Sequence, residues 1–238
     1  MEKKWLLCDL HVHTTFSDGV LDLRSLIDFY GKRGFDVISV TDHLQDLETL
    51  KRSMSAGKTV HSLRRENFGE YLNALRNGAR YSWETYRMLL IPGVELTNDT
   101  RSYHLLIVDV KDYIDPSLPI EEIAAKAREQ EALVIAAHPC RKLDEDGSMS
   151  ILWENHEEYE KLIDAWEIAN RDELYSALGP TGYRFVACSD LHKPEHIYSW
   201  KTLVYAEKNV ESFKKAVKAG RTAIYFYDSR FDSNRIDV

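Results

Sequence analysis

The chain has 238 residues, of which 44% are hydrophobic, and its formal net charge is -8 at pH 7. This length and apolar content suffice for one substantial core, so we expect a single domain spanning residues 1–238. The acidic balance argues against an extended nucleic-acid interface, because such interfaces carry clustered Lys and Arg that neutralise phosphates.

Membrane and disulfide features are absent from the sequence. No apolar run is long enough to span a bilayer, and the stretch 5–8 is too short for the core of a signal peptide. The three cysteines, Cys8, Cys140 and Cys188, cannot all pair and show no Cys-x-x-Cys spacing. We therefore expect reduced thiols in a cytoplasmic protein, serving as small apolar filler at strand ends in preference to metal ligands.

Short apolar runs predict buried strands. In chain order they are residues 5–8, 37–40, 89–91 with Val94, 105–108, 133–137, 165–169 and 185–188. Helical patterns lie between several of them, at residues 23–33, 67–83, 120–131, 154–162 and 210–219. Strands that alternate with helices predict an α/β fold with a parallel barrel. Two further runs, 203–205 and 223–227, are expected to complete or flank it.

Two segments depart from simple alternation. The stretch at about 45–88 is long, charged and helical in character, which predicts an insertion that covers the site as a lid. The link that follows Glu95 is too short for a helical crossover, which predicts an antiparallel hairpin near residues 89–108. Such a hairpin would return His104 to the same end of the sheet as Glu95.

Five of the nine histidines lie in four short motifs, and three of these motifs also contain an acid. They are Asp9-Leu10-His11-Val12-His13, Asp42-His43, His138-Pro139 and Ser189-Asp190-Leu191-His192. Since alternate side chains of a strand share a face, Asp9, His11 and His13 are expected to point the same way. The same rule places Asp190 and His192 together. Imidazoles and carboxylates gathered at strand ends indicate a multinuclear metal site, because unpaired polar groups there would be costly.

The order of these motifs resembles the PHP family, whose name stands for polymerase and histidinol phosphatase. Besides the histidine motifs, the resemblance rests on Ser17-Asp18-Gly19, on Thr41 before Asp42-His43 and on Pro92-Gly93-Val94-Glu95. It covers nearly the whole chain. It implies a distorted (β/α)7 TIM-like barrel of the PHP type, with the site at the C-terminal ends of the strands.

The resemblance also implies which residues hold metal. One ion would be held by His11, His13, Glu95 and Asp190, a second by Glu95, His104 and His138, and a third by Asp18, His43 and His192. Glu95 would bridge two of them. Imidazoles mixed with carboxylates suit zinc, manganese or iron, so we expect two or three such divalent ions.

Three further residues are expected to support the chemistry. Asp9 and Asp42 are expected each to accept a ring N–H and so to fix which histidine nitrogen faces the metal, with direct ligation as the alternative. Arg141 is the first candidate for binding phosphate, because a guanidinium fork grips two oxygens at once. Arg101, Arg171 and Lys193 are weaker candidates for the same role.

The function implied is that of a metal-dependent phosphoric ester hydrolase. A metal-held hydroxide would attack a small phosphorylated metabolite or nucleotide. A non-catalytic module that binds metal for structure or docks a partner is one alternative, but the full ligand set favours the enzyme. The other alternative is a nuclease acting on oligonucleotide ends. Ser17-Asp18-Gly19 resembles that branch, whereas Leu44 and the short interval from His138 to Asp190 argue against it.

Overall fold

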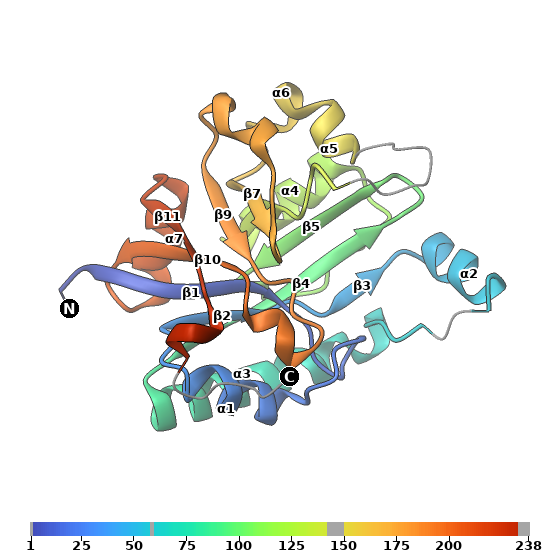
Figure 1. Cartoon of the computed structure of the whole chain (residues 1–238). Helices are drawn as coiled ribbons and strands as arrows, with labels where there is room; N and C mark the ends of the chain where they lie inside the picture. The colour runs from blue at the N-terminus through green and yellow to red at the C-terminus, as the bar shows by residue number, and fades with distance from the viewer. Residues whose placement is uncertain (1, 58–59, 142–149, 233–238) are drawn as a thin grey trace.

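The computed structural model describes residues 2–57, 60–141 and 150–232 (Figure 1). Within these ranges the strands form one mixed sheet, ordered β11-β10-β1-β2-β4-β5-β6-β7-β8, with β3 paired to β4 and β9 to β7. The strands are β1 (Lys4–Val12), β2 (Val37–Val40), β3 (His43–Gln45), β4 (Leu89–Asn98), β5 (Tyr103–Val108), β6 (Leu133–Ala136), β7 (Ala165–Asn170), β8 (Glu173–Leu174), β9 (Phe185–Cys188), β10 (Trp200–Ala206) and β11 (Thr222–Phe226).

The helices follow the predicted patterns closely, with one exception. They are α1 (Leu23–Gly31), α2 (Leu47–Ser55), α3 (Arg65–Tyr86), α4 (Ile120–Glu129), α5 (Ile151–Glu154), α6 (His156–Tyr159) and α7 (Val210–Lys218), with the 3-10 helices η1 (Ser176–Thr181), η2 (Pro194–Ile197) and η3 (Ser229–Phe231). The helix predicted at 154–162 is two short helices, because the backbone of Asn155 leaves the helical region between them.

No helix in the described ranges combines the length and the apolar character that crossing a bilayer requires.

The α/β fold is confirmed, but its strands are not all parallel. β2 runs parallel to both β1 and β4, and β7 runs parallel to β6 and β9. β10 pairs antiparallel with β1 and β11, while β5 pairs antiparallel with β4 and β6. The predicted hairpin near residues 89–108 is therefore present, and it places His104 opposite Thr97. The sheet curls into part of a barrel, and the repeat count of seven stays a prediction.

The predicted insertion at 45–88 contains two helices with different surroundings. The longer helix, α3, packs on α1 and β4 beneath the sheet, and it buries Phe68, Tyr71 and Leu75 (Figure 1). The shorter helix, α2, lies beyond the end of β3 and leaves Leu47 and Met54 exposed. α3 thus belongs to the layer that covers the sheet. A single domain over residues 1–238, with an insertion, stays a prediction.

β1 carries one extra residue relative to β2, and this residue decides which side chains face the site. Asp9 pairs with Ile38 and Val12 pairs with Val40, so three steps along β1 match two along β2. Val12, Ile38 and Val40 all belong to the apolar cluster that contacts the helices. A bulge of this kind interrupts the alternation of side chains along a strand. Asp9 and Val12 therefore face the helical layer, and His11 faces the opposite side.

Candidate metal centre

The structure brings all nine predicted metal ligands to one end of the curled sheet. They are His11 on β1, His43 on β3, Glu95 on β4 and His104 on β5, together with His13, Asp18, His138, Asp190 and His192 in the segments that follow strands. Three groups of donor atoms lie close enough together to hold an ion: His11, His13 and Glu95; Glu95, His104 and His138; and His13, Asp18, His43 and His192. These groups match the three sets that the resemblance implies, except that Asp190 is missing from the first and His13 is added to the third.

Glu95 is the hub of this cluster, and its side chain is fully buried. Its Oε1 atom lies 2.8 Å from His104 Nδ1 and 3.4 Å from His138 Nε2. Its Oε2 atom lies 3.3 Å from His11 Nε2, 3.4 Å from His13 Nε2 and 2.9 Å from His43 Nδ1. One carboxylate thus reaches five imidazoles, an arrangement that suits the bridging role that the resemblance implies.

Two other acids complete the cluster. Asp190 Oδ1 lies 3.5 Å from His11 Nε2 and 3.4 Å from His13 Nε2, on the side of the rings that also faces Glu95. Asp18 Oδ2 lies 3.2 Å from His192 Nε2, and Asp18 Oδ1 lies 3.7 Å from His43 Nε2. About half of the Asp18 side chain is exposed, so the third set lies nearest to solvent.

Burial and neighbouring charge shift the pKa values in this cluster. Burial opposes ionisation of Glu95 and Asp190, but the surrounding histidines hold both pKa values well below their usual range. Burial, with His43 and His192 nearby, lowers the pKa of His13 to about 3. His13 is therefore neutral at pH 7 and keeps a lone pair for a cation.

Several donor atoms in the cluster are buried and unpaired within the described part of the chain. They are His11 Nε2, both ring nitrogens of His13 and Glu95 Oε2. Buried polar atoms without partners are costly, and here they converge on shared points. Their mixture of imidazole nitrogen and carboxylate oxygen suits zinc, manganese or iron, whereas calcium prefers oxygen alone. The residues present therefore fit a divalent transition-metal centre.

Asp9 does not make the expected hydrogen bond to a histidine ring within the described residues. Its carboxylate accepts hydrogen bonds from the Tyr30 hydroxyl (2.8 Å) and from the backbone N–H (3.0 Å) and hydroxyl (2.6 Å) of Ser189. The ammonium of Lys201 lies 3.5 Å away. The bulge in β1 turns Asp9 away from His11. Asp9 instead anchors Ser189, the residue before Asp190.

Asp42 also lacks the expected hydrogen bond from a histidine ring in the described part of the chain, for a simpler reason. Asp42 directly precedes His43, and neighbouring side chains in an extended segment point to opposite faces. Its carboxylate accepts hydrogen bonds from the backbone N–H and hydroxyl of Thr14, both at 2.8 Å, and from those of Ser17, at 3.1 and 2.6 Å. These four bonds hold the turn that leads to Asp18.

Glu167 and Asp99 take the ring-orienting role that was assigned to Asp9 and Asp42. Glu167 Oε1 lies 2.9 Å from His11 Nδ1, and its Oε2 accepts the backbone N–H of His138 at 2.6 Å. Asp99 Oδ1 lies 3.0 Å from His104 Nε2. Glu167 had one signal in the sequence, since it is a charged residue inside the apolar run 165–169. Asp99, in the loop of the hairpin, had none.

We expect Glu167→Gln to weaken metal binding by about 10- to 100-fold, because loss of a carboxylate that orients a ligating histidine usually has that effect. Competition with a chromogenic chelator measures the change. Glu84→Gln, on the exposed face of α3, is the matched control and should bind metal like the wild type. Unchanged affinity in the Glu167 variant, with the fold intact by circular dichroism, would contradict the assigned role.

Arg141, the predicted phosphate ligand, lies beside the centre. Its Nη1 atom is 3.3 Å from Asp190 Oδ2, and its Nη2 donates to Asn170 Oδ1 at 2.6 Å. Arg171 lies at the same distance, 3.3 Å, from Asp190 Oδ2. Arg101 lines a separate hollow near α4 and α5, and Lys193 is exposed. Of the four candidate cations, the structure brings Arg141 and Arg171 to a metal-centre acid.

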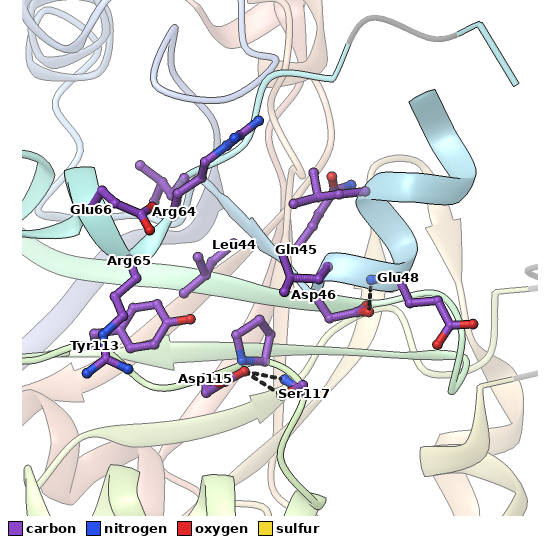
Figure 2. Close-up of a pocket in the computed structure, with 14 residues that line it drawn as sticks. Leu44, Gln45, Asp46, Glu48, Arg64, Arg65, Glu66, Tyr113, Asp115 and Ser117 are labelled. Carbon is purple, nitrogen blue, oxygen red and sulfur yellow. Dashed lines mark hydrogen bonds between the residues drawn. The ribbon is translucent and has the colours of Figure 1, made fainter. Parts of the chain in front are cut away.

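A pocket of about 460 Å³ lies next to β3 but receives none of the nine predicted ligands (Figure 2). β3, α2, the start of α3 and the segment 113–117 form its walls. Apolar side chains such as Leu44 and Tyr113 alternate there with charges of both signs, including Glu48 and Arg65. The pocket therefore lacks the concentration of one charge that would favour a phosphate.

Comparisons with known proteins point in one direction. The sequence profile of the PHP domain matches residues 9–182. Over 63 residues the chain is 33% identical to the DNA polymerase/3'-5' exonuclease PolX of Bacillus subtilis (strain 168), a stretch that covers 24% of this chain and 11% of that protein. The chain thus spans about a tenth of the length of this curated relative.

Solved structures of low sequence identity share the fold. A two-domain protein of Bacteroides vulgatus ATCC 8482 that contains a predicted PHP-like metal-dependent phosphoesterase superposes with a TM-score of 0.70 at 23% identity, over 94% of this chain and 66% of that one. PsfC of Pseudomonas syringae PB-5123 gives 0.62 at 16% identity, over 95% and 93%. Endonuclease Q, in complex with a 27-mer duplex that has an abasic lesion, gives 0.54 at 16% identity, over 91% and 57%.

Proposed function

The chain belongs to the PHP domain family, and on that premise we propose that it is a metal-dependent phosphoesterase acting on a small phosphorylated metabolite or nucleotide. The observation that carries the proposal is the buried Glu95 carboxylate, which lies close to five imidazoles. Two of these rings, His11 and His13, have buried nitrogens without a hydrogen-bond partner in the described residues. Divalent ions held by these residues would lower the pKa of a water molecule and neutralise charge on a phosphoryl group.

The remaining residues of the site prepare it for that chemistry. Glu167 accepts from His11 Nδ1, so Nε2 of this ring is kept for the metal. Asp99 accepts in the same way from Nε2 of His104, so Nδ1 of that ring is kept for the metal. Arg141, partly exposed beside Asp190, offers fixed N–H donors to phosphate oxygens. Glu167 and Asp99 thus orient the ligating rings, and Arg141 would orient the substrate.

Two alternatives stay in view. A nuclease that acts on oligonucleotide ends draws support from the likeness to PolX and, at the level of fold, to endonuclease Q. The net charge of -8 disfavours it, since polynucleotide binding gains most of its affinity from cations. A non-catalytic metal module is disfavoured because the cluster retains every predicted ligand.

The test is hydrolysis by protein stripped with a chelator and reloaded with zinc, manganese or iron. Chromogenic phosphate esters, phosphorylated metabolites, nucleotides and short oligonucleotides form the substrate panel. We expect turnover that requires metal, favours the small substrates and disappears in His11→Ala. Metal bound in stoichiometric amounts without hydrolysis of any ester would support the non-catalytic module. Preference for oligonucleotide ends would support the nuclease.

A further inference from the structure

Two arginines meet on one oxygen of Asp190. Arg141, in the turn after β6, and Arg171, directly after β7, each place a guanidinium nitrogen 3.3 Å from Asp190 Oδ2. The other oxygen, Oδ1, faces His11 and His13 at 3.5 and 3.4 Å. Asp190 therefore has a metal-ligand side and an arginine side, and the two sides are adjacent.

Both arginines are held in place yet remain partly open to solvent. Arg141 is fixed by its bond to Asn170 Oδ1, at 2.6 Å. The backbone of Arg171 is left-handed (φ 52°), with its N–H bonded to the Cys188 carbonyl and its carbonyl to the N–H of Trp200. The side chains of Arg141 and Arg171 are 31% and 37% exposed. Arg171 Nε has no hydrogen-bond partner within the described residues. The exposed parts of the two guanidiniums, and not the buried Arg171 Nε, can thus donate to a ligand that arrives from solvent.

The charges on the arginine side are out of balance. Within the described ranges, Asp190 is the carboxylate that forms ion pairs with both guanidiniums. Its single negative charge is also directed at His11 and His13. Asn170, the other partner of Arg141, is neutral. The buried Glu167 carboxylate also acts on Arg141, but it is shared with His11. An anion that approaches the centre from this side therefore meets two fixed guanidiniums whose positive charge is only partly balanced.

We infer that Arg141 and Arg171 form an arginine clamp that selects phosphate monoesters over diesters, an inference that rests on the proposed function. Near pH 7 a monoester carries close to two negative charges on three unesterified oxygens. A diester carries one charge on two such oxygens. Only the monoester has enough charge and enough oxygens to satisfy both guanidiniums while still presenting oxygen to the metal-ligand side of Asp190.

The same clamp should hold the product. In hydrolysis, the oxygen of water bonds to phosphorus while the bond from phosphorus to the ester oxygen breaks. The departing oxygen gains a proton, so the products are an alcohol and inorganic phosphate. Inorganic phosphate keeps the charge and the free oxygens of the monoester. It is therefore a probe of the clamp that needs no turnover.

The experiment compares p-nitrophenyl phosphate with bis(p-nitrophenyl) phosphate on the metal-loaded full chain. We expect the wild type to favour the monoester in kcat/KM. Arg171→Ala should lower kcat/KM for the monoester by about 10- to 100-fold, the usual worth of a charge-assisted hydrogen bond, and change that for the diester only a few-fold. Arg171→Lys should fall between, since it keeps the charge without the fork. Arg76→Ala, exposed on α3, should match the wild type.

A calorimetric titration with inorganic phosphate supplies the second readout, with metal content measured on each variant. Phosphate binding should weaken in Arg171→Ala by a similar factor while metal content stays at the wild-type level. Equal losses on both esters, preference for the diester, unaltered phosphate binding or loss of metal would each overturn the clamp. If no ester is hydrolysed at all, the proposed function fails, and the phosphate titration still decides the clamp.

Discussion

Glu95→Gln is expected to lower phosphoester hydrolysis by about 10³-fold or more and to reduce the amount of metal bound. Glutamine keeps the shape of the side chain but removes its charge, and its amide NH₂ turns one acceptor position into a donor. That donor would face imidazoles such as His11 and His104, which lie 3.3 and 2.8 Å from the present carboxylate oxygens. Metal ions contribute several kcal/mol to such reactions, and each 1.36 kcal/mol is a factor of ten in rate.

Metal content by elemental analysis and initial rates on a chromogenic ester measure the two effects of this substitution. Glu129→Gln, an exposed residue at the end of α4, is the matched control and should retain metal and activity. Far-ultraviolet circular dichroism shows whether the variant folds. A folded Glu95→Gln protein with a full complement of metal and wild-type turnover would remove the basis for treating Glu95 as the bridging residue.

Most of the ligand set was predictable, because the resemblance to the PHP family names the residues and most of their motifs lie next to strands that the sequence identifies by apolar runs. Strands end where polar residues begin, and in a barrel-like sheet those ends meet. His104 was the exception, since it precedes its apolar run, and the short link after Glu95 predicted the hairpin that returns it to the same end of the sheet. The spacing and the order of the motifs therefore suffice to predict the residues that would contact the metals directly.

The roles of the residues that support the metal ligands were not predictable, and the physical reason differs from one residue to the next. The role of Asp9 depends on a bulge in β1, and a bulge leaves no mark in the alternation of a short strand that is buried on both faces. Glu167 reaches His11 from a strand more than a hundred residues away, so only the three-dimensional arrangement joins them. The antiparallel direction of β10 likewise depends on the path of the chain between Asp190 and Trp200.

Metal binding is expected to release protons and to tighten as the pH rises toward about 9. In the metal-free protein, burial of the His104 ring opposes protonation, but Glu95 and Asp99 outweigh it and raise its pKa to about 9. The same kind of balance, with burial opposed by nearby carboxylates, raises the pKa values of His11 and His43. A ligating nitrogen must be free of its proton, so at pH 7 the metal competes with protons held on these rings.

The direction of this pH dependence follows from the linkage between proton binding and folding stability. A histidine whose pKa is raised in the folded state adds stability that is complete below its unfolded pKa, near 6.5, and is lost as the pH rises through about 9 for His104. Above that window the metal-free protein loses this contribution, and metal no longer has to displace the proton. Each proton displaced at lower pH costs about tenfold in apparent affinity per pH unit.

Calorimetric titration of metal at pH 7, in two buffers with different enthalpies of ionisation, counts the protons released. Chelator competition at pH 6, 7 and 8 gives the slope of affinity against pH. Asp99→Asn should lower the number of protons released at pH 7, because it removes one of the two carboxylates that raise the pKa of His104. Asp112→Asn, at an exposed position before α4, should leave that number unchanged. Heats that do not depend on the buffer, together with an affinity that does not change with pH, would show that these histidines are already unprotonated before metal arrives.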